Sequence, residues 1–498
     1  MLVDTHAMRH KTNMLVVRVD SRIRMSADAL DADTIMRLKK ACEHVNPDFA
    51  KKRSMGYATY NVPAVVKTWK HEVTARGSTL TFPRGAMSRV REQLAKSHVA
   101  FRVVDARSEG SVLAKPLQYV GHDPRSYQRE AAAAALKREQ GVIRAATGSG
   151  KTTTLLWLAA HVGLNSLVIL PSVKLLDQTV EVAGKLLGLH GPQIGVLQGA
   201  KRRLRPLTVA TQQTLWSRSV DDEVRDYFGA VFIDEAHHAA AKTFGESIDQ
   251  FPARYRFAFT ADERRKDRKE FLVYDAFGDV LHETSREKCE EVGAVVDVEV
   301  RILLTNFRAE WYAGDPDFNK LLEAMTSDEE RDGIAITHAL DELRSGEQLI
   351  MLTHRREHAH ALERALVVNG IKSGCMLGGA GADGVEFDRS RTGLRDGSVR
   401  AGVGTYEALG EGIDLPAVAV GFATTPIATN KQRFNQVRGR LCRPSEGKTH
   451  GRLYVMFDRH VFDERAYANI LAWNRTVKVF WHGQWVDARS AKRVIMSA

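Results

Sequence analysis

The chain has few cysteines and no motif that would place them in pairs. Cys42, Cys289, Cys375 and Cys442 are the only four in 498 residues, and none of them belongs to a CxxC sequence. A disulfide framework or a thiolate zinc site would need such close spacing. The sequence therefore argues against both and favours a reducing compartment.

Long apolar runs and internal repeats are also missing. The most apolar stretch, which begins at Thr154, is interrupted by His161, Asn165 and Ser166, so it predicts a buried helix followed by a buried strand and no membrane span. The first residues, MLVDTHAMRHKTN, show no apolar run followed by a cleavage site, so we expect no secretory leader. No period of about 20–50 residues is visible, which argues against a solenoid.

Basic residues clearly outnumber acidic residues in one part of the chain, and the two are nearly equal in the remainder. The formal net charge is +11; residues 1–119 contain 21 Lys and Arg against 11 Asp and Glu, whereas the remainder contains 51 against 50. Clustered positive charge is typical of proteins that neutralise the phosphates of a polyanion. The first quarter therefore predicts a nucleic-acid-binding domain, and a basic domain that is merely soluble is the alternative.

What the chain does contain is a regular alternation of short apolar runs and longer helical patterns, which is typical of βαβ units around buried parallel sheets. We predict an α/β protein with two tandem parallel-sheet domains, at residues 120–290 and 291–465. A small basic α+β domain at 1–119 precedes them, and a C-terminal extension at 466–498 follows. The apolar runs that support this prediction lie at 141–147, 167–171, 207–211, 230–234, 256–261, 349–353, 375–379, 400–405, 417–424 and 452–458.

Two segments outside the alternating series carry their own expectations. In the first domain we predict helices over 31–44 and 84–96. The aromatic and basic tail from Ile470 is either a strand pair that packs on the second parallel-sheet domain, which we favour, or a DNA contact.

A glycine-rich loop follows the first apolar run. The stretch RAATGSGKTTTL, residues 144–155, lies between a predicted strand and a predicted helix, as a phosphate-binding loop must. Backbone N–H groups would turn toward phosphates, Lys151 would reach the β- and γ-phosphates, and Thr152 would offer its hydroxyl to Mg²⁺. Ala145 replaces the first glycine of the usual pattern. The predicted ATP-binding residues of this loop are Thr147, Gly148, Ser149, Gly150, Lys151 and Thr152.

Two carboxylates end another apolar run, in the sequence VFIDEAHH at 231–238. A carboxylate that follows a strand of an open α/β sheet lies in the ligand crevice. We predict that Asp234 holds Mg²⁺ and that Glu235 orients or deprotonates an attacking water molecule. An acidic helix cap would explain Asp234 alone, but it would not explain the whole DEAH string.

The loop and the DEAH string together resemble the motifs of superfamily 2 helicases and translocases, and further motifs follow in the same order over about residues 120–460. The resemblance implies two tandem RecA-like domains. SYQRE at 126–130 is similar to the adenine-side motif, which implies ATP contacts by Tyr127 and Gln128. VATQQTL at 209–215 is similar to a strand-end motif, which implies nucleic-acid contacts by Thr211 and Gln212.

The remaining motifs similar to this superfamily are of two kinds. Some would couple nucleotide binding to nucleic-acid binding, and others lie in the second parallel-sheet domain. FTAD at 259–262 is similar to the coupling motif, although Asp262 departs from it. LTHRREHAHAL at 352–362 resembles motif IV and GTYEALGEGIDLP at 404–416 resembles motif V. The roles implied are coupling for His237, Thr260 and Ala261, nucleic-acid contact for Thr353 and Thr405, and nucleotide contact for Gly412 and Asp414.

Arginines are concentrated in QVRGRLCRP at 436–444. An arginine placed at the γ-phosphate can raise the rate of phosphoryl transfer by ~10³–10⁵. Arg440 and Arg443 are three residues apart, so on one helical turn they would share a face. We predict that both act as catalytic arginines and that Gln436 contacts the γ-phosphate or the attacking water. Arg438 faces elsewhere, and DNA or a carboxylate would be its partner. A plain basic strip is the alternative.

The subfamily follows from the same motifs. EGIDLP and QVRGRLCR resemble XPB-like, RecG-like and phage UvsW-type DNA helicases more than the RNA-directed group. The resemblance implies a cytoplasmic, monomeric enzyme of a bacterium or an infected cell that uses ATP and Mg²⁺ and acts on single-stranded, duplex or branched DNA, without a membrane. Three functions remain open: a branch-migrating helicase, a duplex translocase of a restriction or defence system, and an ATP-gated binding switch.

Overall fold

The computed structural model describes residues 14–217, 220–236, 245, 247–261, 268–312, 317–377, 382–410, 415, 417–445 and 447–497. The chain divides into two compact units between Ser285 and Arg286, and the short stretch Thr147–Ser149 is grouped with the second unit. None of the helices in these ranges is long and apolar enough to cross a membrane.

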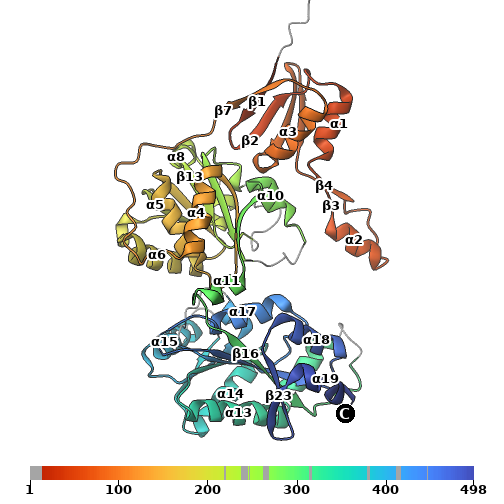
Figure 1. Ribbon diagram of the computed structural model, residues 1–498, viewed down its shortest axis with the longest axis vertical. Helices are drawn as coiled ribbons and strands as arrows, with labels where there is room; N and C mark the ends of the chain where they lie inside the picture. Colours follow the sequence, from red (N-terminus) through yellow and green to blue (C-terminus); the bar gives the residue numbers. More distant parts are fainter. Residues whose placement is uncertain are drawn as a thin grey trace, which may run out of the picture. The chain divides into compact units, whose positions relative to one another are not determined.

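The first unit begins with a five-stranded sheet of order β5-β6-β2-β1-β7 (Figure 1). Alternate residues of β1 are buried, and Val17 is completely so, because one face of this sheet packs on helices and the other meets solvent. The elements are β1 (Leu15–Val19), β2 (Arg22–Ser26), α1 (Ala32–Lys40), β5 (Lys70–Thr74), β6 (Gly77–Pro83), α3 (Met87–Lys96) and β7 (Phe101–Asp105).

Helix α1 is shorter than the sequence predicted. Asp31 caps its N-terminus, since the Asp31 carboxylate accepts a hydrogen bond of 2.7 Å from the Thr34 backbone N–H. The helix ends at Lys40, and the predicted last turn instead forms β3 (Glu43–Val45), which pairs with β4 (Val65–Lys67) in a separate two-stranded sheet. The expected helix over 31–44 was therefore too long, because pairing with a strand about twenty residues away overrode the helical pattern.

A mostly parallel sheet of eight strands completes the first unit, in the order β11-β10-β12-β9-β13-β14-β8-β15. Residues of β9 alternate between two apolar clusters, with Val168 and Leu170 in one and Leu167 and Ile169 in the other, so both faces of the sheet are covered. The main elements are α4 (Ser126–Arg138), β8 (Gln140–Ala145), α5 (Lys151–Val162), β9 (Ser166–Leu170), α6 (Val173–Leu187), β10 (Gly195–Gln198), β11 (Lys201–Arg203), β12 (Leu207–Thr211), α7 (Gln212–Ser217), α8 (Asp222–Tyr227), β13 (Ala230–Ile233), β14 (Tyr255–Thr260), α10 (Phe271–Phe277) and β15 (Val280–Thr284).

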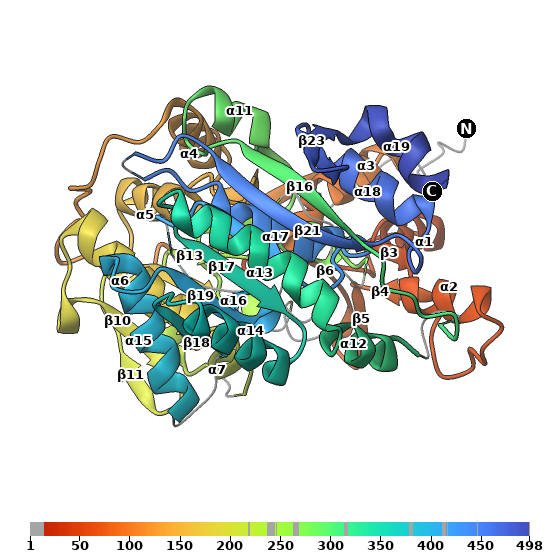
Figure 2. The same cartoon turned by 90° about the horizontal axis from the view of Figure 1, so that it is seen from below.

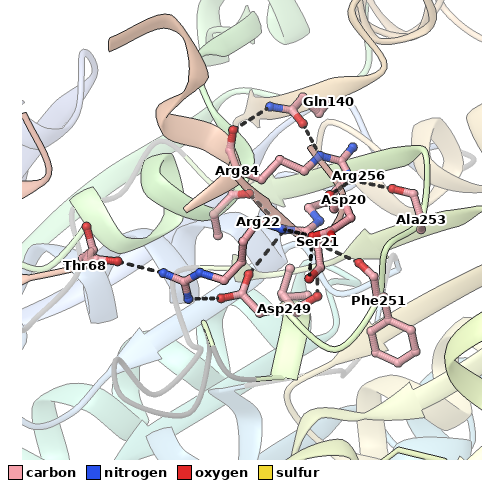
Figure 3. A network of polar contacts seen from close by, with 12 residues as sticks. Asp20, Ser21, Arg22, Thr68, Arg84, Gln140, Asp249, Phe251, Ala253 and Arg256 are labelled. Carbon is pink, nitrogen blue, oxygen red and sulfur yellow. Dashed lines mark hydrogen bonds and ion pairs between the residues drawn. The ribbon is translucent and has the colours of Figure 1, made fainter. Parts of the chain in front are cut away.

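The two sheets of the first unit are joined by arginines, of which Arg84 is fully buried and Arg22 is part-buried (Figure 3). Arg84 has no exposed surface, and its guanidinium donates hydrogen bonds of 2.5 Å to the Ala253 carbonyl and to the side-chain oxygen of Gln140. Arg22 forms an ion pair of 2.6 Å with Asp249. A buried charge is tolerated only when it is paired and hydrogen-bonded. These contacts therefore favour one relative placement of the two sheets.

The second unit contains another mostly parallel sheet of eight strands, in the order β18-β19-β17-β20-β21-β16-β22-β23. Val420 and Phe422 of β20 pack with α13 and α14, whereas Gly421 faces Leu441 of α17, so helices cover both faces (Figure 2). The main elements are α11 (Arg286–Glu291), β16 (Val298–Thr305), α12 (Phe318–Thr326), α13 (Glu329–Arg344), β17 (Leu349–Thr353), α14 (Arg356–Val368), β18 (Ser373–Met376), α15 (Ala382–Asp396), β19 (Ala401–Thr405), α16 (Tyr406–Gly410), β20 (Val420–Ala423), α17 (Lys431–Leu441) and β21 (Gly451–Asp458).

The tail of the chain adds strands to this second sheet. Strand β22 (Val477–Trp481) pairs in parallel with β16, and β23 (Gln484–Asp487) pairs antiparallel with β22. Two helices, α18 (Glu464–Trp473) and α19 (Ala488–Ser497), flank the strand pair. Residues 477–481 and 484–487 thus extend this sheet, so the tail packs on the second parallel-sheet domain.

Candidate active site

The loop between β8 and α5 has the backbone of a phosphate-binding loop. Gly148 and Gly150 have φ angles of 88° and 82°, in the left-handed region that side chains disfavour. A Cβ atom on Gly150 would also lie 2.7 Å from Nε2 of Gln128. Helix α5 begins at Lys151, so its free N–H groups and its partial positive charge are available to an anion.

Thr152 and Asp234 meet at this loop. The Thr152 hydroxyl donates a hydrogen bond of 3.2 Å to the Asp234 carboxylate, and Asp234 follows directly on β13. Burial, together with the negative charge of Glu235, raises the pKa of Asp234 to about 6, although the positive charge of Lys151 opposes the change. The described part of the chain contains no group of three or more His, Cys, Asp or Glu side chains that could hold a metal ion.

This pair of oxygen donors fits Mg²⁺. That ion is usually held by one or two carboxylates together with substrate phosphates and water, so it does not need a cage of protein ligands. A divalent cation beside Asp234 would also supply the positive charge that a buried carboxylate requires. Thr152 and Asp234 are therefore the residues that would hold it.

Glu235 lies beside the phosphate-binding lysine. Its carboxylate oxygen Oε1 is 3.3 Å from Nζ of Lys151, and the two side chains are 25% and 8% exposed. Glu235 also has a φ angle of 52°, which is uncommon for a residue with a side chain and tends to occur at functional sites. The other carboxylate oxygen, Oε2, is buried, and the contact of Glu235 with an attacking water molecule stays a prediction.

Gln128 ties the start of α4 to the phosphate loop. Its side-chain oxygen accepts a hydrogen bond of 2.9 Å from the Arg125 backbone N–H, and its Nε2 donates one of 3.4 Å to the Gly150 carbonyl. Gln128 has no exposed surface and Tyr127 is 3% exposed. The structure brings both residues close to the loop, and their contacts with a base stay a prediction.

The other predicted residues of the first unit follow strands β12 and β14. Thr211 ends β12, where its hydroxyl shares a hydrogen bond of 2.8 Å with Thr214. Gln212 begins α7, and its buried Nε2 has no hydrogen-bond partner among the described residues. Thr260 ends β14 and Ala261 follows it, at the same edge of the sheet. His237 lies outside the described residues.

Thr353 is the predicted residue whose environment argues most against its role. Its side chain is completely buried, and its hydroxyl is 2.7 Å from Nδ1 of His358, whose other ring nitrogen is 2.8 Å from Asp332. A hydroxyl enclosed in this way stabilises the start of α14, and its contact with nucleic acid stays a prediction. Sequence reasoning could not detect the enclosure, because Asp332 is distant in the sequence.

Thr405 lies at the end of β19 and is 7% exposed. Its hydroxyl accepts a hydrogen bond of 3.3 Å from the Ala408 backbone N–H, which fixes the start of α16. Gly412 and Asp414, the predicted nucleotide contacts of this region, lie outside the described residues.

Helix α17 carries Gln436 and Arg440 but not Arg443. The helix ends at Leu441, so the expectation that Arg440 and Arg443 share a helical face was wrong. The physical reason is Pro444, because proline disfavours a helical conformation in the residue before it. The catalytic role of both arginines stays a prediction and no longer rests on a common helical face.

Arg438 has a structural role that the sequence did not reveal. Its guanidinium donates hydrogen bonds of 2.5 Å to the Trp473 carbonyl, 2.9 Å to the Asn474 side chain and 3.0 Å to the Asn435 side chain. Burial, together with the nearby charge of Arg286, lowers its pKa to about 10. Arg438 therefore joins α17 to the end of α18.

Comparisons with known proteins agree with this arrangement. A sequence model of the family described as Type III restriction enzyme, res subunit, matches residues 121–264. The chain is 28% identical over 352 residues to the protein named DNA 3'-5' helicase Rad25 of Halobacterium salinarum, which covers 69% of this chain and 55% of the relative. It is 23% identical over 360 residues to the DNA 3'-5' translocase XPB2 of Sulfurisphaera tokodaii, which covers 65% of this chain and 79% of that relative.

The fold is similar to that of a solved structure. Dbp5 of S. cerevisiae bound to RNA and ADP BeF3 matches with a TM-score of 0.51 at 14% identity, over 75% of this chain and 93% of that chain. Together with the two eight-stranded sheets, this likeness confirms the predicted fold of tandem RecA-like domains after a small sheet domain. The chain spans about half the length of the Rad25 relative, 55% of it.

Proposed function

We propose that this chain, whose sequence resembles that of superfamily 2 helicases of the XPB type, is an ATP-dependent DNA helicase or translocase. The observation that carries the proposal is the convergence of Lys151, Thr152, Asp234 and Glu235 at the carboxyl ends of β8 and β13. The motif order and the relatives named as DNA 3'-5' helicase and translocase support it.

In the proposed reaction, the chain's own residues bind the triphosphate and position a water molecule. The loop N–H groups and Lys151 hold the β- and γ-phosphates, and Glu235 orients the water that attacks the γ-phosphate. Bound Mg²⁺, held by Thr152 and Asp234, would neutralise part of the phosphate charge. Gln436, Arg440 and Arg443 supply the remaining contacts to the γ-phosphate when the two RecA-like domains close on ATP.

Movement along DNA follows from contacts that alternate between the two domains. We propose that Thr211 and Gln212 contact the strand from the first domain and that Thr405 contacts it from the second. Gln212 is the best supported of these three candidate contacts. Its buried side-chain nitrogen Nε2 has no hydrogen-bond partner among the described residues, and a phosphate oxygen could accept its hydrogen bond. Gly412 and Asp414 would contact the nucleotide, and His237, Thr260 and Ala261 would couple the two ligands.

The basic first domain holds DNA ahead of the motor in this proposal. More specifically, we propose that the protein is a cytoplasmic monomer that unwinds duplex DNA and drives branch migration. A restriction-type duplex translocase is the second candidate, because the res-subunit family model matches 121–264. The third, an ATP-gated binding switch, would require no movement.

The test is ATP hydrolysis by the full chain with single-stranded, duplex and branched DNA and with RNA. We expect stimulation by DNA above that by RNA. Strand displacement on forked and four-way substrates then supports the helicase, triplex displacement without strand separation supports the translocase, and ATP-dependent binding alone supports the switch. Absence of ATP hydrolysis under all these conditions would overturn the proposal.

A further inference from the structure

The first domain carries a projecting segment, residues 46–64, which we call the tyrosine arm. It connects β3 to β4 and contains helix α2 (Pro47–Ser54) (Figure 1). Asn46 closes its root: the Asn46 backbone N–H donates a hydrogen bond of 3.0 Å to the Ala64 carbonyl, and its side chain donates one of 2.8 Å to the Pro63 carbonyl. The arm is therefore a closed loop with a defined base.

Helix α2 does not belong to a hydrophobic core. None of its side chains is buried, although Asn46 caps it and Pro47 occupies its first turn. A helix this short is marginal by itself and in most proteins is stabilised by packing an apolar face. Most side chains of α2 are exposed, so much of its surface is open to contact with another molecule.

The outer surface of the arm combines aromatic rings with positive charge. Tyr57 and Tyr60 are 66% and 87% exposed, far more than tyrosines that pack in a fold. Lys51, Lys52 and Arg53 are all exposed on the helix that leads to them. The arm's acidic residue, Asp48, is already neutralised by an ion pair of 2.7 Å with Lys269.

The root of the arm is anchored to the first RecA-like domain. His44 of β3 lies 2.9 Å from the Asp275 carboxylate of α10, and the Thr68 hydroxyl donates a hydrogen bond of 2.5 Å to the same carboxylate. Arg89 of α3 also pairs with Asp275, whose side chain is 3% exposed. A ligand of the arm is therefore held at a fixed place relative to the ATP-binding domain.

We propose that the tyrosine arm binds an unpaired nucleic-acid strand, with bases stacked on Tyr57 and Tyr60 and phosphates beside Lys51, Lys52 and Arg53. The inference rests on the proposed function and adds a strand-binding surface outside the motor motifs. Aromatic platforms next to a positively charged track are the usual means of holding single strands without sequence preference.

Chemistry favours this occupant over two others. A duplex hides its base faces within the stack, so exposed tyrosines would gain nothing from it. A protein partner is disfavoured because lysine is depleted at the centres of protein interfaces. Unpaired bases use both the rings and the charges of the arm.

The test measures DNA affinity of the full chain by fluorescence anisotropy, with a fluorescein-labelled oligo(dT) and a blunt hairpin duplex of equal nucleotide number. Stacking on an aromatic side chain contributes about 1–3 kcal/mol per base, so Tyr57→Ala with Tyr60→Ala should weaken oligo(dT) binding at least about tenfold. The matched variant Tyr57→Phe with Tyr60→Phe keeps the rings and should bind as the wild type does.

A second variant tests the charges. Replacing Lys51, Lys52 and Arg53 by Gln should flatten the dependence of log affinity on log salt, by up to about 2 for three lost phosphate contacts on a single strand. The proposal is overturned if the alanine variant binds oligo(dT) as tightly as the wild type, if the phenylalanine variant is equally impaired, or if duplex affinity falls as much as single-strand affinity.

Basal ATP hydrolysis without nucleic acid separates this inference from the proposed function. It should be unchanged in all arm variants, because the arm contributes nothing to the phosphate site. Loss of strand affinity with intact hydrolysis supports the inference. A wild-type chain that does not hydrolyse ATP would refute the proposed function, whereas normal hydrolysis with unchanged strand affinity would refute the arm alone.

Discussion

At the scale of single residues, the candidate active site depends on opposite charges held close together with little water. Asp234 is 5% exposed, and its pKa is raised to about 6 because burial and Glu235 disfavour its charge. Lys151 opposes that effect from a position 8% exposed. A divalent cation held by Thr152 and Asp234, as proposed, would favour the ionised form of this buried carboxylate.

Lys151→Ala should abolish ATP hydrolysis. The substitution removes the charge that holds the β- and γ-phosphates, and no described side chain on α5 near the loop replaces it. Turnover is measured by phosphate release at saturating DNA. Lys185→Ala, which removes a 70% exposed lysine from α6, is the control and should be silent. Wild-type turnover in Lys151→Ala would show that the site is assigned wrongly.

Arg443→Ala and Arg438→Ala should fail in different ways. Loss of a catalytic arginine lowers phosphoryl transfer by ~10³–10⁵, so Arg443→Ala should bind ATP and scarcely hydrolyse it. Arg438→Ala leaves the Trp473 carbonyl without its donor, and each buried group left unpaired costs about 1–3 kcal/mol of unfolding free energy.

Chemical denaturation and nucleotide-binding titrations distinguish the two variants. Arg438→Ala should lower the denaturation midpoint of the second unit, whereas Arg443→Ala should leave it unchanged. If Arg443→Ala instead weakened DNA binding and left hydrolysis intact, the arginine cluster would be a basic strip.

At the scale of elements, α10 is one of the parts of the first RecA-like domain to which the basic first domain is attached. Its Asp275 receives contacts from β3, from α3 and from the residue after β4. Burial by itself would raise the pKa of Asp275, but the hydrogen bond from His44, the charge of Arg89 and the hydrogen bond from Thr68 hold it below its ordinary value. The attachment is thus stabilised by a carboxylate that must stay ionised.

The attachment should weaken in acid. Because the pKa of Asp275 is lower in the folded chain than in the unfolded chain, its contribution is complete above the ordinary value of 3.8 and is lost as the pH falls through the folded value. Asp275→Asn should therefore be less stable than wild type at pH 7, with the difference shrinking below about pH 4. Urea unfolding across this range measures it, and a difference independent of pH would contradict the prediction.

At the scale of the whole molecule, the part of the chain that carries the positive charge is not a separate compact unit. Nearly all of the +11 net charge lies in residues 1–119. Those residues nevertheless form one compact unit with the first RecA-like domain, because arginines cross between their sheets (Figure 3). In the proposed motor, a basic domain fixed in this way would carry bound DNA along with the first RecA-like domain during each ATP cycle.

Arg84→Ala should uncouple the first sheet from the motor sheet. The variant removes donors to the Ala253 and Arg254 carbonyls and to Gln140, so a loss of about 3 kcal/mol or more is expected. Hydrogen exchange should then become faster in β1 and β2 while β9 and β13 stay protected. Equal acceleration in all four strands would indicate general unfolding. Arg84→Lys should behave like the alanine variant, because the single ammonium nitrogen of lysine cannot reach all three acceptors at once.

The sequence by itself determined the parallel strands, the phosphate loop and the carboxylates after β13. These depend on residues adjacent in the chain, whose periodicity and spacing specify local conformation and strand ends. Only the tertiary structure decided what Arg438, Thr353 and Arg84 do, that α1 stops at Lys40, and that Arg443 lies beyond its helix. The partners of these residues are distant in the sequence, or their geometry depends on packing. Neither the hydrophobic pattern nor the net charge of a segment shows which distant atoms will be in contact.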